Sequence, residues 1–227
     1  MMRARIPDVM NAPVTLQSIY QQLYDNYGPQ DWWPGDSPFE VMVGAVLTQN
    51  TAWANVEKAI ANLREHGALD PAAIMAASDD DLADWLRPSG YFNVKATRLQ
   101  HLCRWYLETG GYASLARMGT NALRQALLAV HGVGPETADD ILLYAFERPV
   151  FVIDAYTRRL FARLGLFEGA ESYENMRSGV EASLGPDVGL FNEFHALIVR
   201  HAKEVCRVRP RCPGCTFSAC CPGCEGA

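Results

Sequence analysis

The stretch that decides the fold runs from His131 to Asp154: His131-Gly132-Val133-Gly134-Pro135-Glu136-Thr137-Ala138, a further helical pattern, and then Val152-Ile153-Asp154. It predicts two helices joined by a tight glycine turn, then a short apolar link and an acid that opens a third helix. Glycine at positions 132 and 134 permits a positive φ and a close approach of the backbone to an outside group. Pro135 suits a first helical position, and the free amides of such a helix start form an anion site.

The composition is that of a globular protein with a substantial core: 227 residues, 49% of them hydrophobic, and a formal net charge of −6. A negative total disfavours nucleic-acid binding, but a binding face needs only a local basic patch. Residues 195–211 supply one, because against Glu204 they carry five basic residues, Arg200, Lys203, Arg207, Arg209 and Arg211. The sequence has neither a membrane-spanning apolar run nor a signal-peptide pattern, so we expect a cytoplasmic protein.

Apolar spacing and capping signals predict an all-α protein of about ten helices. Ser37-Pro38-Phe39-Glu40 is a strong helix start, and the helix through Leu47 is apolar on nearly every side, which predicts a central, buried position. The acid run Asp79-Asp80-Asp81 follows Ser78 and indicates a capped helix end rather than a metal site. Cys103 lies on an apolar helix face and is expected in the core.

The hairpin and the acid together resemble the endonuclease III branch of the helix-hairpin-helix DNA glycosylase superfamily. The resemblance covers nearly the whole chain; Gly-Val-Gly alone is a weak signal, but Val-Ile-Asp at the right distance strengthens it. It implies that the amides of Gly132, Val133 and Gly134 bind a DNA phosphate and that Asp154 is catalytic. A helix N-terminus keeps a carboxylate ionised, and an anion stabilises the oxocarbenium-like sugar as the base leaves. An ordinary N-cap is the plainer role for Asp154, and the two roles are compatible.

Glu136 departs from the family pattern. In the bifunctional members of the endonuclease III family, the equivalent position is a lysine that attacks the sugar, forms a Schiff base and goes on to cut the strand. A glutamate cannot form an imine. The sequence therefore predicts a monofunctional enzyme with weak or absent AP-lyase activity, unless one of the three lysines, Lys58, Lys95 or Lys203, substitutes.

Six of the seven cysteines lie in residues 206–224, and in a reducing compartment such clustering favours a metal over disulfides. Four of them resemble the family's [4Fe–4S] loop: Cys206, Cys212, Cys215 and Cys221. The first gap is one residue shorter than the family's usual spacing, and the adjacent Cys220 leaves the fourth ligand open between positions 220 and 221.

A zinc site is the alternative to the cluster. Cys212-Pro-Gly-Cys215 and Cys221-Pro-Gly-Cys224 are two knuckles that could together make a tetrathiolate site. In either case we expect the metal to be structural and to hold a basic loop against phosphates, with Arg207, Arg209 and Arg211 as its charges.

Aromatic residues flank the predicted buried helix. Trp32 and Trp33 before it and Trp53 after it resemble the 3-methyladenine glycosylase subgroup of this branch, where the corresponding aromatics stack on the flipped base. A base methylated at a ring nitrogen is already cationic, so its enzyme needs electron-rich faces rather than a proton donor. Tryptophans at helix ends also commonly fill core, which is the alternative.

Two polar segments resemble DNA-contacting parts of the family. Gln49 and Asn50 resemble the wedge that fills the space left by the flipped base, with a plain polar turn as the alternative. Asn93 and Lys95 match a stretch near the DNA backbone, and an ordinary helix start explains them equally well.

The resemblance implies two helical lobes with a DNA-binding cleft between them. Residues 37–153 would form a six-helix barrel carrying the helix-hairpin-helix, and residues 1–36 with 154–227 a lobe with the metal cluster. The implied function is base-excision repair of double-stranded DNA by a nucleoid-associated monomer that removes an alkylated base such as 3-methyladenine. The alternatives are an endonuclease III-like glycosylase for oxidised or mismatched pyrimidines and a non-catalytic DNA-binding relative.

Overall fold

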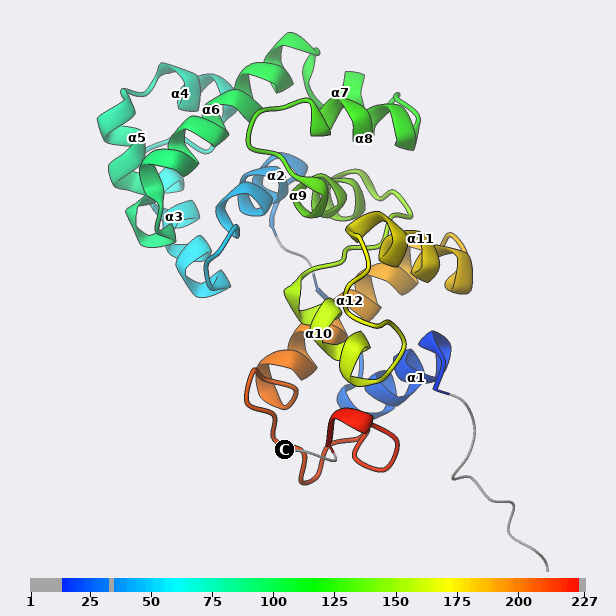
Figure 1. The fold of residues 1–227 in the computed structure, drawn as a ribbon. Helices are drawn as coiled ribbons and strands as arrows, with labels where there is room; N and C mark the ends of the chain where they lie inside the picture. The colour runs from blue at the N-terminus through cyan, green and yellow to red at the C-terminus, as the bar shows by residue number, and fades with distance from the viewer. Residues whose placement is uncertain (1–13, 33–34, 225–227) are drawn as a thin grey trace, which may run out of the picture. The chain divides into compact units, whose positions relative to one another are not determined.

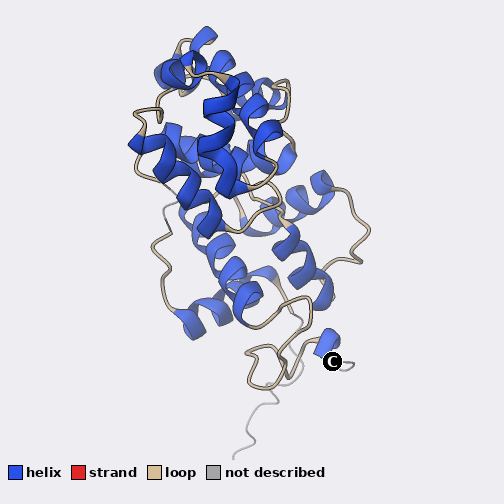
Figure 2. Cartoon of the chain, turned by 90° about the vertical axis from the view of Figure 1, so that its left-hand side faces the viewer, coloured by secondary structure: helices blue, strands red, loops and turns tan. Residues whose placement is uncertain are grey.

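The computed structural model describes residues 14–32 and 35–224, and these residues form helices and loops without a strand (Figures 1 and 2). This confirms the all-α prediction. None of the helices described has the length and apolar character that a bilayer crossing needs. The α-helices are α1 Leu16–Tyr27, α2 Pro38–Leu47, α3 Trp53–Glu65, α4 Pro71–Ala76, α5 Asp79–Leu86, α6 Phe92–Glu108, α7 Gly111–Leu115, α8 Thr120–Leu128, α9 Pro135–Asp140, α10 Ala155–Arg163, α11 Tyr173–Leu184 and α12 Val188–Glu204.

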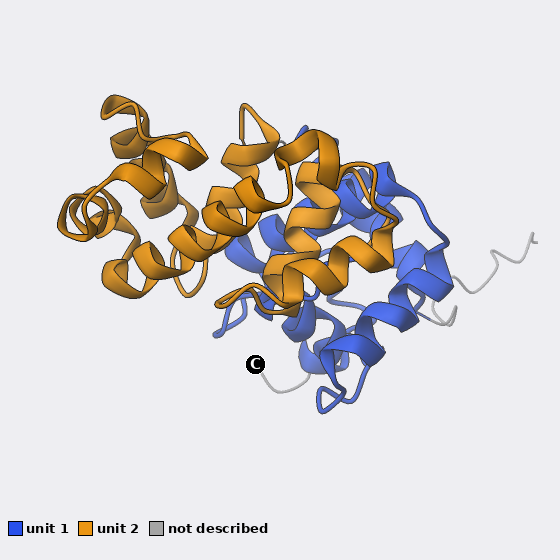
Figure 3. Cartoon of the chain, turned by 90° about the horizontal axis from the view of Figure 1, so that it is seen from above, with its two compact units in different colours: residues 1–32, 151–227 blue, residues 33–150 orange. Residues whose placement is uncertain are grey.

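Three short segments complete the secondary structure of the residues that the structure describes. The 3-10 turns are η2 Arg87–Ser89 and η4 Pro222–Cys224, and the π-helical segment η3 Ile141–Ala145 continues directly from α9. The chain divides into two compact units, residues 33–150 and residues 1–32 with 151–227 (Figure 3). The division predicted from the sequence lies at residues 36–37 and 153–154.

Helix α2 is the central element of the 33–150 unit. The Ser37 hydroxyl accepts a hydrogen bond from the Glu40 amide, and Pro38 occupies the first turn, as the sequence predicted. Every residue from Phe39 to Leu47 is buried, and the helix packs against α3, α6, α9 and η3. The loop that follows α2 and the glycine hairpin before α9 are therefore both attached to one buried helix.

The outer helices of this unit follow their capping signals. The Ser78 hydroxyl accepts from the Asp81 amide, so the acid run is a capped helix end. Helices α4 and α5 pack on α6. Cys103 on α6 is fully buried, which confirms its core position, and burial raises the pKa of its thiol to about 12.

Helix α12 is the core of the other unit and packs against α1 and α10. Aromatic side chains fill the space around it, and four phenylalanines have no exposed surface: Phe151, Phe161, Phe191 and Phe194. Their rings meet at centroid separations of 5.4 to 6.0 Å. This packing fixes α10, and with it the position of Asp154 at the start of α10.

Candidate functional site

The hairpin between α8 and α9 depends on Gly132. Its φ is +91°, and a Cβ added there would lie 2.3 Å from Cγ of Arg98, so both the backbone and the space require glycine. Val133 is buried and its amide donates to the Val130 carbonyl at 3.0 Å, which anchors the turn.

Gly134 differs from the expectation. Its backbone is extended, with φ −92° and ψ 178°, so the predicted positive φ holds only at Gly132. A Cβ at Gly134 would meet nothing within 4 Å. The residue is the N-cap of α9 and no side chain caps that helix. The fold therefore does not need glycine at position 134. A group from outside the protein that approaches the first turn of α9 would need it, because a side chain at this position would occupy that space.

The two wedge candidates have different surroundings. The Gln49 side-chain amide donates to the Gly132 carbonyl at 3.0 Å and to the Thr137 hydroxyl at 2.9 Å, and Arg98 donates to its Oε1. Gln49 thus joins the loop after α2 to the hairpin. Asn50 is exposed and has a left-handed backbone with φ +55°.

Lys95 is buried and is not available to DNA. The sequence match that placed it near the DNA backbone is therefore wrong for this residue. It is only 1% exposed, and its Nζ donates to the Leu47 carbonyl at 2.8 Å and to the Ser89 carbonyl at 2.7 Å. Burial, together with nearby Arg98, lowers the pKa of Lys95 to about 8. These contacts fix the start of the loop that carries Gln49 and Asn50.

Asp154 is the N-cap of α10, which confirms the simpler part of its predicted role. Its Oδ1 accepts from the Thr157 amide at 2.7 Å, and its side chain is 15% exposed. His195 on α12 faces the other oxygen, with Nε2 3.6 Å from Oδ2. Burial alone would raise the pKa of Asp154, but the neighbouring His195 and the Thr157 amide bring it below its ordinary value.

His195 was not among the residues singled out from the sequence. It is 6% exposed and lies far along the chain from Asp154. The available signal was a polar side chain on the otherwise apolar, buried stretch of α12 from Phe194 to Val199.

The position equivalent to the family's lysine lies at the exposed start of α9, where Glu136 supplies a carboxylate and no amine. Of the three lysines, Lys95 is committed to two backbone carbonyls, Lys58 is exposed on α3, and Lys203 is exposed on α12.

The predicted base-pocket tryptophans belong to different units. Trp32 lies in the unit of α12, where Nζ of Lys203 is 6.0 Å from its ring centroid. Trp53 opens α3 and packs against α2, since a Cβ at Gly44 would lie 3.2 Å from its ring. Trp33 falls outside the described residues.

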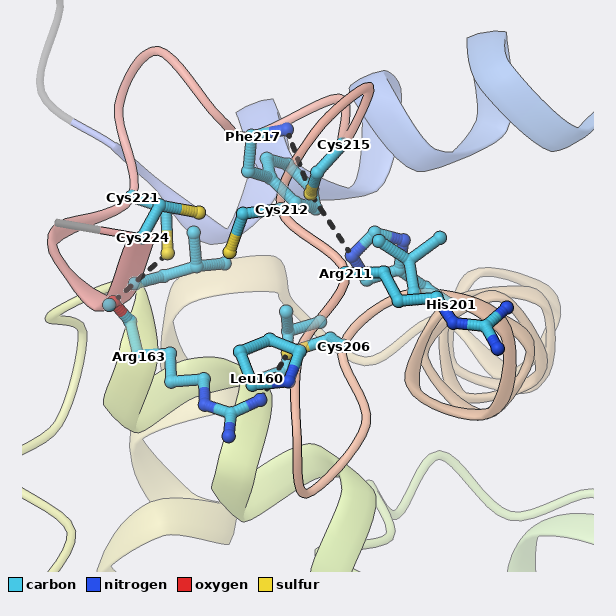
Figure 4. A pocket seen from close by; sticks show the side chains of 14 residues that line it. Leu160, Arg163, His201, Cys206, Arg211, Cys212, Cys215, Phe217, Cys221 and Cys224 are labelled. Carbon is cyan, nitrogen blue, oxygen red and sulfur yellow. Dashed lines mark hydrogen bonds between the residues drawn. The ribbon is translucent and has the colours of Figure 1, made fainter. Parts of the chain in front are cut away.

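Five cysteines line one pocket, which is partly open to solvent (Figure 4). They are Cys206, Cys212, Cys215, Cys221 and Cys224. Cys220 is exposed, is not among the lining residues, and directs its thiol to the Phe217 carbonyl at 3.6 Å. Of the two adjacent candidates, position 221 is therefore the one that faces the pocket.

The pocket sits at the C-terminal end of α10. Arg163 donates to the Cys206 sulfur at 3.3 Å, and the Cys221 thiol donates to the Arg163 carbonyl at 3.3 Å. Within residues 14–32 and 35–224, no group of three or more His, Cys, Asp or Glu side chains is already arranged to hold a metal ion. The donors nevertheless fit a thiophilic metal in kind, and the exposed Arg207, Arg209 and Arg211 lie in the same loop.

The thiols of this pocket influence one another. The pKa of Cys224 rises to about 12, chiefly because of a hydrogen bond with Cys212, with burial and the neighbouring Cys221 adding to the effect. Crowded thiols resist ionisation unless a cation compensates the charge, and metal binding provides such compensation.

Comparisons with known proteins show the family of the chain. Residues 43–186 match the HhH-GPD superfamily of base excision DNA repair proteins. A protein of Methanocaldococcus jannaschii, provisionally named a DNA repair glycosylase, is 43% identical over 209 residues, which cover 91% of this chain and 95% of that protein.

Two solved structures extend the comparison. The 3-methyladenine DNA glycosylase of H. pylori, bound to 1,N6-ethenoadenine, is 30% identical with a TM-score of 0.72, over 82% of this chain and 96% of that chain. A non-covalent endonuclease III–DNA complex has a TM-score of 0.80 at 22% identity, over 93% of this chain and 97% of that chain, and shows likeness of fold.

Proposed function

Because the chain belongs to the HhH-GPD superfamily of base excision DNA repair proteins, we propose that it is a DNA glycosylase that hydrolyses the N-glycosidic bond of a flipped, alkylated base. The observation that carries this proposal is the carboxylate of Asp154. It is nearly buried, it caps α10, and its surroundings lower its pKa, so it is an anion at neutral pH. A fixed, partly desolvated anion is what a developing oxocarbenium ion requires.

The reaction is a hydrolysis in which the protein supplies binding and electrostatics. Damaged double-stranded DNA binds through the amides of the hairpin, where open space beside Gly134 admits a phosphate. The bond between C1′ and the base nitrogen breaks, and its electron pair leaves with the base. Water then adds to C1′ and loses a proton, while Asp154 stabilises the positive sugar.

Two features support a reaction that stops at the abasic site. Glu136 cannot form an imine, and Lys95 is buried against two carbonyls.

Asn50 is the better candidate for the wedge, because it is exposed in a left-handed turn while Gln49 is hydrogen-bonded to the hairpin.

We keep Trp32, Trp33 and Trp53 as separate candidates for stacking on a cationic methylated base. The likeness to a 3-methyladenine glycosylase supports this choice. One observation favours the second candidate, a glycosylase for neutral oxidised or mismatched pyrimidines. The Lys203 ammonium already lies 6.0 Å from the Trp32 ring, and a positive charge there would repel a cationic base on that face.

We further propose a [4Fe–4S] cluster held by Cys206, Cys212, Cys215 and Cys221. The alternative is a zinc ion held by the two knuckles, Cys212 with Cys215 and Cys221 with Cys224. When bound, the metal would supply a structural clamp that orders the loop of Arg207, Arg209 and Arg211 for phosphate binding. Iron and sulfide analysis of the purified protein tests this. Brown colour with visible absorption supports the cluster, and a colourless protein with stoichiometric zinc contradicts it.

The function is tested by single-turnover excision on duplexes that each carry 3-methyladenine, 7-methylguanine, thymine glycol, uracil or a G·T mismatch. We expect excision of the methylated purines and a loss of about a hundredfold or more in Asp154→Asn. Asp187→Asn is the matched control, because Asp187 is also an N-cap aspartate, on α12, whose Oδ1 accepts a backbone amide at 2.9 Å. Near wild-type excision by Asp154→Asn would refute the catalytic role.

A further inference from the structure

The carboxylate of Asp154 is approached from two separate helices. The Thr157 amide, in the first turn of α10, holds Oδ1 at 2.7 Å. His195, on α12, presents Nε2 to Oδ2 at 3.6 Å. We propose that His195 is a positioning residue for Asp154, fixing the orientation of the carboxylate that faces the sugar. The inference rests on the proposed function, since it assigns His195 a purpose in that reaction.

One hydrogen bond to Oδ1 restrains the rotation of the carboxylate only within the range of angles that a hydrogen bond tolerates. The torsion that turns a carboxylate about its last bond is broad and roughly two-fold, so side-chain preference does not fix it. A second group beside Oδ2 narrows the remaining range of orientations. Electrostatic stabilisation of a transition state depends on such fixed orientation, because a group that must reorganise during the reaction loses much of its effect.

His195 is itself held rigidly. It is 6% exposed, and its neighbours along α12, Phe194 and Ala196, are fully buried. Helix α12 packs directly against α10, so the imidazole and the carboxylate are carried by two elements with a fixed separation. A polar ring in such a core costs desolvation energy, which a contact to a buried anion offsets.

The protonation state matters for the proposed role. A neutral imidazole with its proton on Nε2 can donate toward Oδ2 and leaves the full negative charge on Asp154. A protonated imidazole would offset that charge and weaken the stabilisation of the sugar cation. His195 and Thr157 are the groups that lower the pKa of Asp154 against the effect of burial. A neutral imidazole that donates toward Oδ2 would therefore leave the stronger stabilisation of the sugar cation.

The test compares His195→Leu, which removes the donor at similar volume, with His195→Gln, which keeps an amide donor. In His195→Leu we expect the single-turnover excision rate to fall about tenfold to a hundredfold while the Kd for lesion DNA changes less than about threefold. His195→Gln should recover most of this loss. His66→Leu, at an exposed histidine on the other unit, is the control. A wild-type rate in His195→Leu, or equal losses in both variants at unchanged Tm, would overturn the proposal.

A second measurement is independent of excision. Titration of the Asp154 carboxyl carbon by NMR should give a pKa below the ordinary aspartate value in the wild type and a higher one in His195→Leu. An identical pKa in both proteins overturns the positioning role, whatever the enzyme excises. If no base of the panel is excised while the pKa responds to His195, the contact stands and the proposed function fails instead. If His195→Leu does not fold, the same comparison is made with His195→Met, which also removes the donor beside Oδ2.

Discussion

Arg124 on α8 and Asp139 on α9 form a bidentate ion pair across the two helices that flank the hairpin. Nε lies 2.6 Å from Oδ1 and Nη2 lies 3.0 Å from Oδ2. The side chain of Asp139 is fully buried and that of Arg124 is 9% exposed. Since the planar guanidinium matches the carboxylate in both position and direction, the pair fixes the angle at which α9 leaves the turn.

Removing one partner should therefore destabilise the hairpin strongly. In Arg124→Met the buried carboxylate keeps its desolvation cost and loses the bidentate Arg124 guanidinium, and we expect the free energy of unfolding to fall by about 3–5 kcal/mol. The double variant Arg124→Met/Asp139→Leu should recover part of that loss, because no buried charge is left. Urea unfolding measures both. Equal destabilisation in the single and double variants would contradict this account.

The two hairpin glycines should respond differently to alanine. Gly132→Ala combines a positive φ with a clash against Arg98, so we expect it to lower stability by about 1–3 kcal/mol. Gly134→Ala meets open space in the fold and should leave the Tm nearly unchanged, but its methyl group would keep a phosphate from the helix start. We expect Gly134→Ala to weaken DNA binding about tenfold or more, as measured by fluorescence anisotropy. Unchanged affinity in Gly134→Ala would place the phosphate elsewhere.

Local signals predicted most of the helical framework. Caps such as Ser37 and Ser78 act on amides within the same turn, so their effect is visible in a short stretch of sequence. The N-cap role of Asp154 was predictable for the same reason. Helix α7 was not predicted, because Gly111–Leu115 is too short to show a helical period.

Long-range contacts could not be predicted in this way. Nothing near His195 in the sequence indicates that its imidazole faces Asp154, since that contact depends on how α10 packs on α12. The burial of Lys95 and the attachment of Gln49 to the hairpin have the same origin. The family resemblance supplied candidate roles for some of these residues, whereas the structure separates Gln49 from Asn50 and Cys221 from Cys220.

Lys95 should leave a signature in the pH dependence of stability. Its pKa is about 8 in the folded protein against an ordinary 10.5, so between these values the unfolded chain holds a proton that the native protein has released. Stability from this group is therefore constant below about pH 8 and rises from there to about pH 10.5, by about 3 kcal/mol at most. In Lys95→Met this rise should be missing.

The quantity to measure is the difference in the free energy of unfolding between wild type and Lys95→Met as a function of pH. The contribution of Cys103 to the free energy of unfolding falls with rising pH over an overlapping range, because its raised pKa keeps the thiol protonated in the native state. This contribution is common to wild type and Lys95→Met. Urea unfolding at several pH values, with Lys58→Met as the control at an exposed lysine, isolates the effect. Parallel pH curves for wild type and Lys95→Met would show that Lys95 titrates normally.

Restoring an amine to the hairpin should extend the reaction beyond base removal. In Glu136→Lys the new amine would stand at the exposed start of α9, where the bifunctional relatives carry theirs, and could attack the sugar carbon to form an imine. With borohydride present, we expect a covalent enzyme–DNA adduct for Glu136→Lys and none for the wild type or for Glu136→Gln, which alters the charge without adding a nucleophile. A wild-type adduct would mean that another amine attacks. Its loss in Lys58→Met or Lys203→Met would then identify the nucleophile, and the monofunctional assignment would be wrong.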